Sequence, residues 1–326
     1  MMRARKWIFR FGAVLVGLAG ASLTGELAFR VLGIEAPAAP SADQVDAFKV
    51  RNDLNALGLR EPPGFPPPRQ DREIRIAVLG DSMTYGEGVE AEQAFPKLLS
   101  ARLNALESGH DLDRRMFTVV NMGKLGDDTP AEVERFRRLA DSIDPDVVLL
   151  VMYVNDFAGA GGPDDALHQI YRLRDTLFWP SQYSRLCEYV ERKIRLRASF
   201  NETIRHYRAD TERGVEPEAL EPVARAVAEL SELCKARKCR LVVCMMPWLV
   251  RLNDYPLPAM HAAVQQLSTD LGLPFCDLLP AVANQDDEAM RVSPANHHPS
   301  AAAHQRIADY LADWLATQNV VETAAR

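Results

Sequence analysis

The chain has 326 residues, of which 47% are apolar, 25% charged and 7% aromatic. This composition excludes a disordered, collagen-like or disulfide-scaffold protein. The formal net charge is −7, from 38 basic and 45 acidic residues, which argues against a protein that coats nucleic acid duplexes. The length allows two domains, or one α/β domain with a tail and an insert.

The five cysteines form no C-x-x-C pair and show no spacing typical of a zinc ribbon. We therefore predict no structural metal site. Because an odd number leaves at least one thiol free, we expect buried apolar cysteines, with one disulfide as the alternative.

The N-terminus has the pattern of an export signal. Four basic residues precede an uncharged run at positions 11–25: Arg3, Arg5, Lys6 and Arg10. Basic residues before an apolar stretch direct a chain to the membrane. The run is shorter than the roughly 20 residues that span a bilayer, but apolar residues resume up to Ile34. We predict a signal peptide or membrane anchor in residues 1–35, with an amphipathic soluble helix as the alternative.

The next stretch, residues 36–70, is rich in proline and alanine, which disfavours a helix. We interpret it as a linker that spaces the body from the membrane, and we expect the folded domain to cover residues 71–320.

The body alternates short β-branched runs with amphipathic helical stripes. Strands are expected at residues 74–79, 117–121, 147–153, 241–246 and 274–277. Helical stripes lie between these runs and after the last one, where they end at Leu315. This order predicts a three-layer α/β/α sandwich with a central parallel sheet of about five strands, similar to flavodoxin.

One stretch, residues 157–217, breaks the alternation because it contains no clear strand and is rich in aromatic residues and arginine. We predict a helical insert after the third strand. Its basic residues indicate either an ordinary solvated surface or a lid or surface for anionic lipid or glycan.

Polar residues gather where the predicted strands end, which is where open parallel sheets carry their reactive groups. The first strand runs into Gly80-Asp81-Ser82, the second into Asn121 and Gly126, and the third into Asn155-Asp156. His297-His298-Pro299 stands just before the last helix, on which His304 is interpreted as structural. Each of these motifs alone is typical of a turn or a helix cap.

Taken together and in this order, the motifs resemble those of the SGNH hydrolase superfamily, also called GDSL esterases and lipases. The resemblance covers residues 75–315, and Gly58 to Arg60 with the proline-rich approach resemble membrane-tethered bacterial members. It implies Ser82 as the nucleophile and His298 as the base, with no cofactor and no metal. It also implies three oxyanion donors: the N–H groups of Ser82 and Gly126 and the side-chain amide of Asn155.

The sequence departs from this family at Asn296, because an aspartate usually stands two or three residues before the histidine. The Asn296 carbonyl can accept the His298 Nδ1–H, but it cannot neutralise an imidazolium. A rotated amide would favour the wrong tautomer. Asp277, Asp286 and Asp287 remain alternative acceptors.

These motifs predict an exported or membrane-tethered serine esterase of the bacterial cell envelope, secreted if its signal is cleaved. The expected partners are an acyl ester of a lipid or an O-acylated glycan, and the membrane through the N-terminal segment, but no nucleic acid. Alternatives are an O-acyltransferase for an extracellular glycan or lipid, and a catalytically impaired binding homologue. A metal hydrolase is a further alternative, for which six residues are candidates: Asp81, Asp127, Asp128, Asp156, His297 and His298.

Overall fold

The computed structural model describes residues 2–34, 54–107, 115–157, 179–195, 197–198, 217–293 and 296–320. Its contacts divide the chain into two units. The first comprises Met1–Ser41 and Asp165–Thr203, and the second comprises Ala42–Asp164 and Ile204–Arg326.

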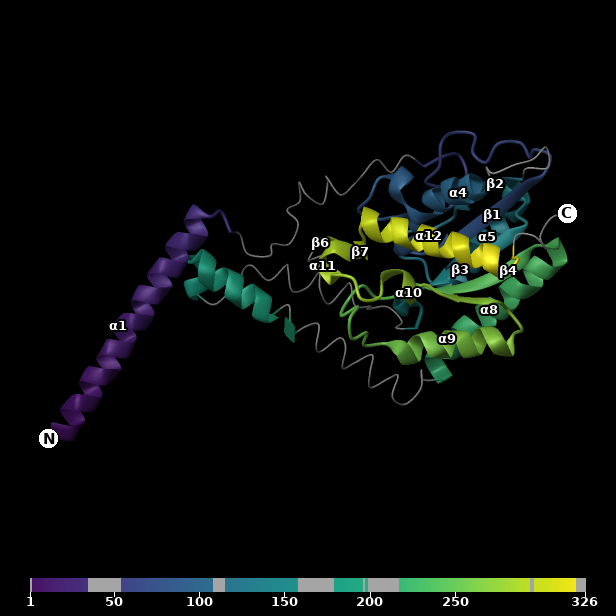
Figure 1. Cartoon of the computed structure of the whole chain (residues 1–326). Helices are drawn as coiled ribbons and strands as arrows, with labels where there is room; N and C mark the ends of the chain where they lie inside the picture. Colours follow the sequence, from purple (N-terminus) through teal and green to yellow (C-terminus); the bar gives the residue numbers. More distant parts are fainter. Residues whose placement is uncertain are drawn as a thin grey trace. The chain divides into compact units, whose positions relative to one another are not determined.

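A five-stranded parallel sheet forms the centre of the second unit (Figure 1). Its strands are β1 (Glu73–Gly80), β2 (Met116–Asn121), β3 (Val147–Met152), β4 (Arg240–Met245) and β5 (Phe275–Asp277). They are ordered β2-β1-β3-β4-β5, and the register pairs Ile76 of β1 with Val119 of β2 and Val147 of β3. All residues of β1 and β3 are buried, as expected when helices cover both faces of a sheet. The predicted sheet is confirmed.

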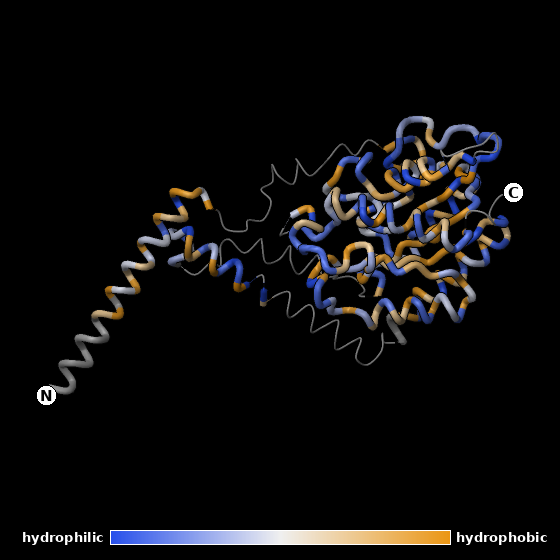
Figure 2. Tube along the Cα trace, viewed as in Figure 1, coloured by the Kyte–Doolittle hydropathy of each residue, from blue (hydrophilic) through white to orange (hydrophobic). Residues whose placement is uncertain are grey.

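Helices cover both faces of this sheet. On one face α4 (Phe95–Leu106) packs against α12 (Ala301–Thr317), and on the other α5 (Thr129–Ile143) packs against α8 (Pro217–Arg237). The remaining long helix, α9 (Pro258–Asp270), packs on β4 and β5. Right-handed crossovers require this division, because the chain moves from β1 outward to β2 and then back across to β3. In Figure 2 the hydrophobic colour follows the strands, while the surrounding helices alternate in hydropathy.

Short elements connect the ends of the strands. They are α3 (Ser82–Tyr85), η1 (Ala91–Gln93), η2 (Val154–Phe157), α10 (Leu279–Val282) and α11 (Asp287–Met290). The segment before α12, which the sequence indicated only as a loop, contains an antiparallel pair of strands, β6 (Arg291–Ser293) and β7 (Asn296–Pro299). This pair places His298 on a strand.

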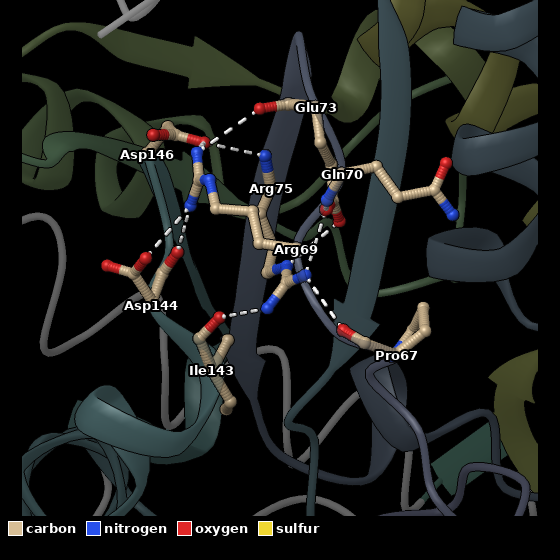
Figure 3. A network of polar contacts seen from close by, with 8 residues as sticks. All are labelled: Pro67, Arg69, Gln70, Glu73, Arg75, Ile143, Asp144 and Asp146. Carbon is tan, nitrogen blue, oxygen red and sulfur yellow. Dashed lines mark hydrogen bonds and ion pairs between the residues drawn. The ribbon is translucent and has the colours of Figure 1, made fainter.

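The domain begins before Asp71, which corrects the predicted extent of the linker. Leu59, Arg60 and Glu61 are buried, with 1%, 3% and 4% of their surface exposed. Residues 67–70 are fastened to the edge of the sheet where β1 begins (Figure 3). Prolines exclude a helix from this stretch, as expected, but they do not prevent an extended chain from packing on the domain.

The fastening in Figure 3 depends on two arginines. Arg75 forms two 2.9 Å contacts with the carboxylate of Glu73, and it donates to the carbonyls of Ile143 and Pro67. Arg69 binds Asp146 and also donates to the carbonyl of Asp144.

The five cysteines are free thiols, and four of them are buried. This agrees with the predicted buried apolar cysteines and not with the alternative of a disulfide. Cys244 of β4 and Cys276 of β5 are paired in the register of the sheet and belong to its core.

The first unit contains α1 (Met2–Val31), η4 (Trp179–Gln182) and a helical stretch at residues 185–195. The Glu26 carboxylate of α1 accepts hydrogen bonds from the Ser184 hydroxyl at 2.8 Å and the Leu186 N–H at 3.0 Å. It therefore caps the start of the 185–195 stretch. The described residues 185–195 are helical, and most of the predicted insert at residues 157–217 lies outside the described part.

The expectation of a membrane-spanning anchor in residues 1–35 is not supported: among the described residues, no helix is long and apolar enough to cross a membrane.

Candidate active site

Ser82 is the first residue of α3 and directly follows the turn after β1. Asp81 caps this short helix, because its Oδ1 accepts the N–H of Met83 at 2.8 Å. Ser82 is partly exposed, whereas Asp81 and Met83 on either side of it are buried. The site lies at the carboxyl ends of β1 and β3, where the crossovers from these two neighbouring strands diverge, the usual position of ligand sites in open parallel sheets.

The loop after β2 packs against α3, the short helix that begins with Ser82. The Asn121 side chain donates to the Thr84 carbonyl at 3.1 Å and accepts the Gly123 N–H at 2.9 Å. A Cβ at Gly123 would lie 2.3 Å from the backbone nitrogen of Tyr85, so glycine is required for this close approach. Asn121 therefore supports α3.

His298 lies within hydrogen-bond distance of Ser82, although 216 positions separate them. The His298 Nε2 is 2.8 Å from the Ser82 Oγ. On the other side of the ring, His298 Nδ1 is 2.6 Å from the Asn296 Oδ1. The structure thus brings the three residues together in one hydrogen-bonded chain.

A second hydrogen bond fixes the orientation of the Asn296 amide. The backbone N–H of His298 points to the same Oδ1 at 3.0 Å, and a backbone N–H can only donate. The atom that faces the imidazole is therefore the carbonyl oxygen, and Nδ1 must carry the ring proton. This arrangement leaves the Nε2 lone pair for the Ser82 proton, which is the tautomer that a general base needs.

The alternative acceptors do not reach the ring. Asp277 binds His261 Nδ1 at 2.7 Å, and Asp286 caps α11 through the Ala289 N–H. Asp287 accepts the N–H groups of Arg251 and Leu252. Asn296 is the partner of His298 Nδ1.

The neighbouring histidines have other partners. His297 Nδ1 accepts the indole N–H of Trp248 at 3.2 Å, and His297 is 1% exposed. His304 Nδ1 accepts the N–H of Phe95 at 3.2 Å and stacks on that ring, in agreement with its interpretation as structural. Burial, followed by the nearby His298 and Arg60, lowers the pKa of His304 to about 3.

Two of the predicted oxyanion donors, Asn155 and Gly126, differ in how they are connected to Ser82. Asn155, on η2, donates from its Nδ2 to the Asp81 Oδ2 at 2.8 Å, so Asp81 connects it to the serine turn. Gly126 lies in the loop after β2, exposed and left-handed with φ 74°, and a Cβ at this position would meet no atom within 4 Å. No contact between Gly126 and Ser82 is among the described hydrogen bonds.

The acidic residues considered for a metal are used in other ways. Asp156 accepts the N–H and the hydroxyl of Thr129, both at 2.7 Å, and burial raises its pKa to about 6. Asp127 binds Arg135, and Asp128 caps α5. Among the residues that the structure describes, no group of three or more such side chains could hold a metal ion.

One residue of the site was missed by sequence reasoning. The Glu87 Oε2 lies 3.2 Å from the His298 Nε2, and the Glu87 side chain is 39% exposed. Glu87 follows the serine by five positions in the Gly86-Glu87-Gly88 turn. The sequence shows a carboxylate five positions after the serine, and this was the sign that could have identified Glu87. Where the Glu87 side chain points depends on the conformation of the turn.

A parallel α/β sandwich with a serine hydrogen-bonded to a histidine at the end of its first strand is the arrangement expected of an SGNH-type ester hydrolase. The sequence model of the GDSL-like Lipase/Acylhydrolase family matches residues 78–306. The chain belongs to this family.

The individual proteins that match this chain do so over a short region or at low sequence identity. An arylesterase from Vibrio mimicus is 37% identical over 82 residues, which cover 25% of this chain and 38% of that protein. Among solved structures, TesA is 16% identical with a TM-score of 0.45, over 74% of this chain and 97% of that chain. The esterase EstA from Pseudoalteromonas sp., inhibited by monoethylphosphonate, is 14% identical with a TM-score of 0.46, over 75% of this chain and 98% of that chain.

Proposed function

We propose that the protein is a serine esterase in which Ser82 is the nucleophile, His298 the general base and Asn296 the residue that orients the imidazole. The observation that carries this proposal is the continuous chain from Ser82 Oγ through the His298 ring to Asn296 Oδ1, at 2.8 and 2.6 Å.

In the first half-reaction the Ser82 oxygen attacks the ester carbonyl while His298 Nε2 takes the hydroxyl proton. The imidazolium then returns this proton to the departing alcohol, which leaves an acyl group on Ser82. In the second half-reaction His298 takes a proton from water, the resulting hydroxide attacks the acyl group, and the free acid leaves as Ser82 regains its proton.

The tetrahedral intermediate carries a negative oxygen that needs hydrogen-bond donors. We assign this role to the N–H groups of Ser82 and Gly126 and to the Nδ2 of Asn155. Asn155 Nδ2 has two hydrogens, so it can donate one to Asp81 and keep the other for the oxyanion. Each such donor contributes about 3 to 4 kcal/mol to transition-state stabilisation in comparable enzymes.

We further propose that residues 1–35 direct export, on the basis of the basic residues before the uncharged run. The catalytic domain would then act outside the cytoplasm on an acylated lipid or glycan. Fractionation of cells that express the full chain, with N-terminal sequencing of the mature protein, tests this; recovery of the full-length chain in the cytosol alone would contradict it.

A fluorophosphonate probe tests the catalytic proposal. The probe should form a covalent adduct located at Ser82 by mass spectrometry, and Ser82→Ala should abolish both the adduct and the hydrolysis of a short acyl ester. Ser100→Ala is the matched control, because Ser100 donates to the Phe117 carbonyl and has no part in the site. A folded wild-type protein that neither reacts with the probe nor releases free acid would contradict the proposal.

A further inference from the structure

We propose that Glu87 supplies the negative charge that the Ser82–His298–Asn296 chain lacks, by stabilising the His298 imidazolium from its Nε2 side. This inference goes beyond the proposed function and rests on it, because the imidazolium forms only if His298 takes the serine proton.

Two oxygen atoms lie close to the same imidazole nitrogen. The Ser82 Oγ lies 2.8 Å and the Glu87 Oε2 lies 3.2 Å from the His298 Nε2. When the ring is neutral, Nε2 carries a lone pair that can accept the serine proton. Once protonated, Nε2 becomes a donor, and the Glu87 carboxylate is then within hydrogen-bond distance of it.

The uncharged Asn296 makes this contact consequential. In a Ser-His-Asp enzyme the aspartate stabilises the imidazolium, and its replacement by asparagine costs about 10⁴ in rate. Part of that loss comes from the wrong tautomer, which the backbone N–H of His298 prevents here by fixing the Asn296 amide. What remains missing is a negative charge, and Glu87 is a carboxylate in contact with the ring.

The turn that carries Glu87 is firmly held. The Arg60 guanidinium donates to three carbonyls of this turn, those of Tyr85 (3.1 Å), Gly86 (2.7 Å) and Val89 (2.6 Å). Arg60 is 3% exposed. The Glu87 N–H also bonds the Ser82 carbonyl at 3.2 Å.

The other side of the turn is packed against β6. Gly88 has φ 85°, and a Cβ at this position would lie 2.7 Å from a methyl group of Val292. Glycine therefore allows the turn to lie against the strand beside β7, which carries His298. These contacts fix the backbone of Glu87 relative to the imidazole.

Other titratable groups around His298 do not replace Glu87. On α12, His304 has a pKa of about 3 and is neutral at assay pH. On β7, His297 accepts a hydrogen bond from the indole N–H of Trp248 at Nδ1. Arg291 of β6 donates its Nε–H to the Asp287 carbonyl, and Asp81 at the start of α3 accepts from Met83 and Asn155. Burial raises the pKa of Tyr85 on α3, so its hydroxyl stays neutral as well.

Glu87→Gln tests the inference because it removes the charge and keeps the shape. The Glu87 side chain is 39% exposed, so solvent weakens its attraction to the imidazolium. We expect kcat/KM to fall about tenfold, mainly through kcat, because the imidazolium forms only on the way to the transition state. Glu87→Asp, which keeps the charge, should recover part of the rate. Glu92→Gln, at an exposed position of the same connection, is the matched control.

A double-mutant cycle with Asn296→Asp separates electrostatics from structure. If Glu87 compensates for the missing aspartate, Glu87→Gln should cost less than about threefold in the Asn296→Asp background, because the charge is then supplied at Nδ1. An equal loss in both backgrounds, or an unchanged kcat in Glu87→Gln, would overturn the inference. Either outcome can be measured only if wild-type turnover depends on Ser82. Failure of the proposed function is therefore a different result, which would show as the absence of both turnover and probe labelling.

Discussion

Asp81 serves two parts of the site at once. One carboxylate oxygen caps the serine helix through Met83, and the other holds the amide of Asn155. The residue is 3% exposed, so both bonds are protected from water. A single side chain therefore sets the distance between the proposed nucleophile and a proposed oxyanion donor, which explains why an aspartate precedes the serine.

Asn155 should matter for the chemical step more than for binding. We expect Asn155→Ala to lower kcat about 10²- to 10³-fold with a much smaller change in KM, because an oxyanion donor acts on the transition state. Steady-state kinetics on a soluble ester measure this. Asn253→Ala, at an exposed position, should retain wild-type kinetics. An Asn155→Ala enzyme with unchanged kcat would exclude Asn155 from the oxyanion site.

Residue types and order were sufficient to predict that Ser82, His298 and Asn296 lie close together. Their motifs end predicted strands or precede a predicted helix, and topology brings such positions to one edge. The contact of Glu87 could not be predicted in this way. It depends on the left-handed turn around Gly86 and Gly88 and on a strand pair that the sequence indicated only as a loop.

Strand β1 has distinct tasks at its two ends. Its last residue leads into the serine turn, whereas its first residues hold the entering chain through Glu73 and Arg75 (Figure 3). The prolines of residues 62–68 led to the prediction of a spacer. A proline-rich composition excludes a helix, but it does not show whether the extended segment packs on the domain. Whether an extended segment is solvated or packed is decided by tertiary contacts, here those of Leu59, Arg60 and Arg69.

Removal of Arg75 should destabilise the domain without a direct effect on catalysis. Arg75→Met leaves the buried Glu73 carboxylate without its arginine partner, so we expect a loss of about 3 to 5 kcal/mol in the free energy of unfolding. Urea unfolding measures the loss, and kcat per folded molecule should stay within about twofold of wild type because the site lies at the other end of β1.

Arg102→Met serves as the control for that experiment. Arg102 forms exposed pairs with Asp309 and Asp313, so its removal should cost about 0 to 1 kcal/mol. Equal losses for the two arginine variants would contradict the assigned role of the Arg75 clamp.

At the level of the whole molecule, the buried His304 connects stability to pH. Its pKa is about 3 in the folded protein and about 6.5 in an unfolded chain. Below pH 6.5 the unfolded chain therefore binds a proton that the folded protein does not bind. The stability that the neutral His304 provides is complete above pH 6.5 and is lost as the pH falls toward 3.

His304→Asn tests this link between burial and pH. We expect its free energy of unfolding to depend less on pH than that of wild type between pH 6.5 and 3, by up to about 1.4 kcal/mol per unit. Parallel urea unfolding curves at several pH values give this difference, in which the contribution of the other titratable groups cancels. Identical slopes for the two proteins would exclude His304 as a source of acid sensitivity.

The distance of 216 positions between Ser82 and His298 also has a consequence for biosynthesis. During translation the serine motif leaves the ribosome long before the imidazole and the helix that packs behind it. On the proposed mechanism, a nascent chain that still lacks this later segment holds an unactivated hydroxyl and does not attack cellular esters. Turnover then begins only after α12 and β7 have docked on the sheet, so activity would report the folding of the whole catalytic domain.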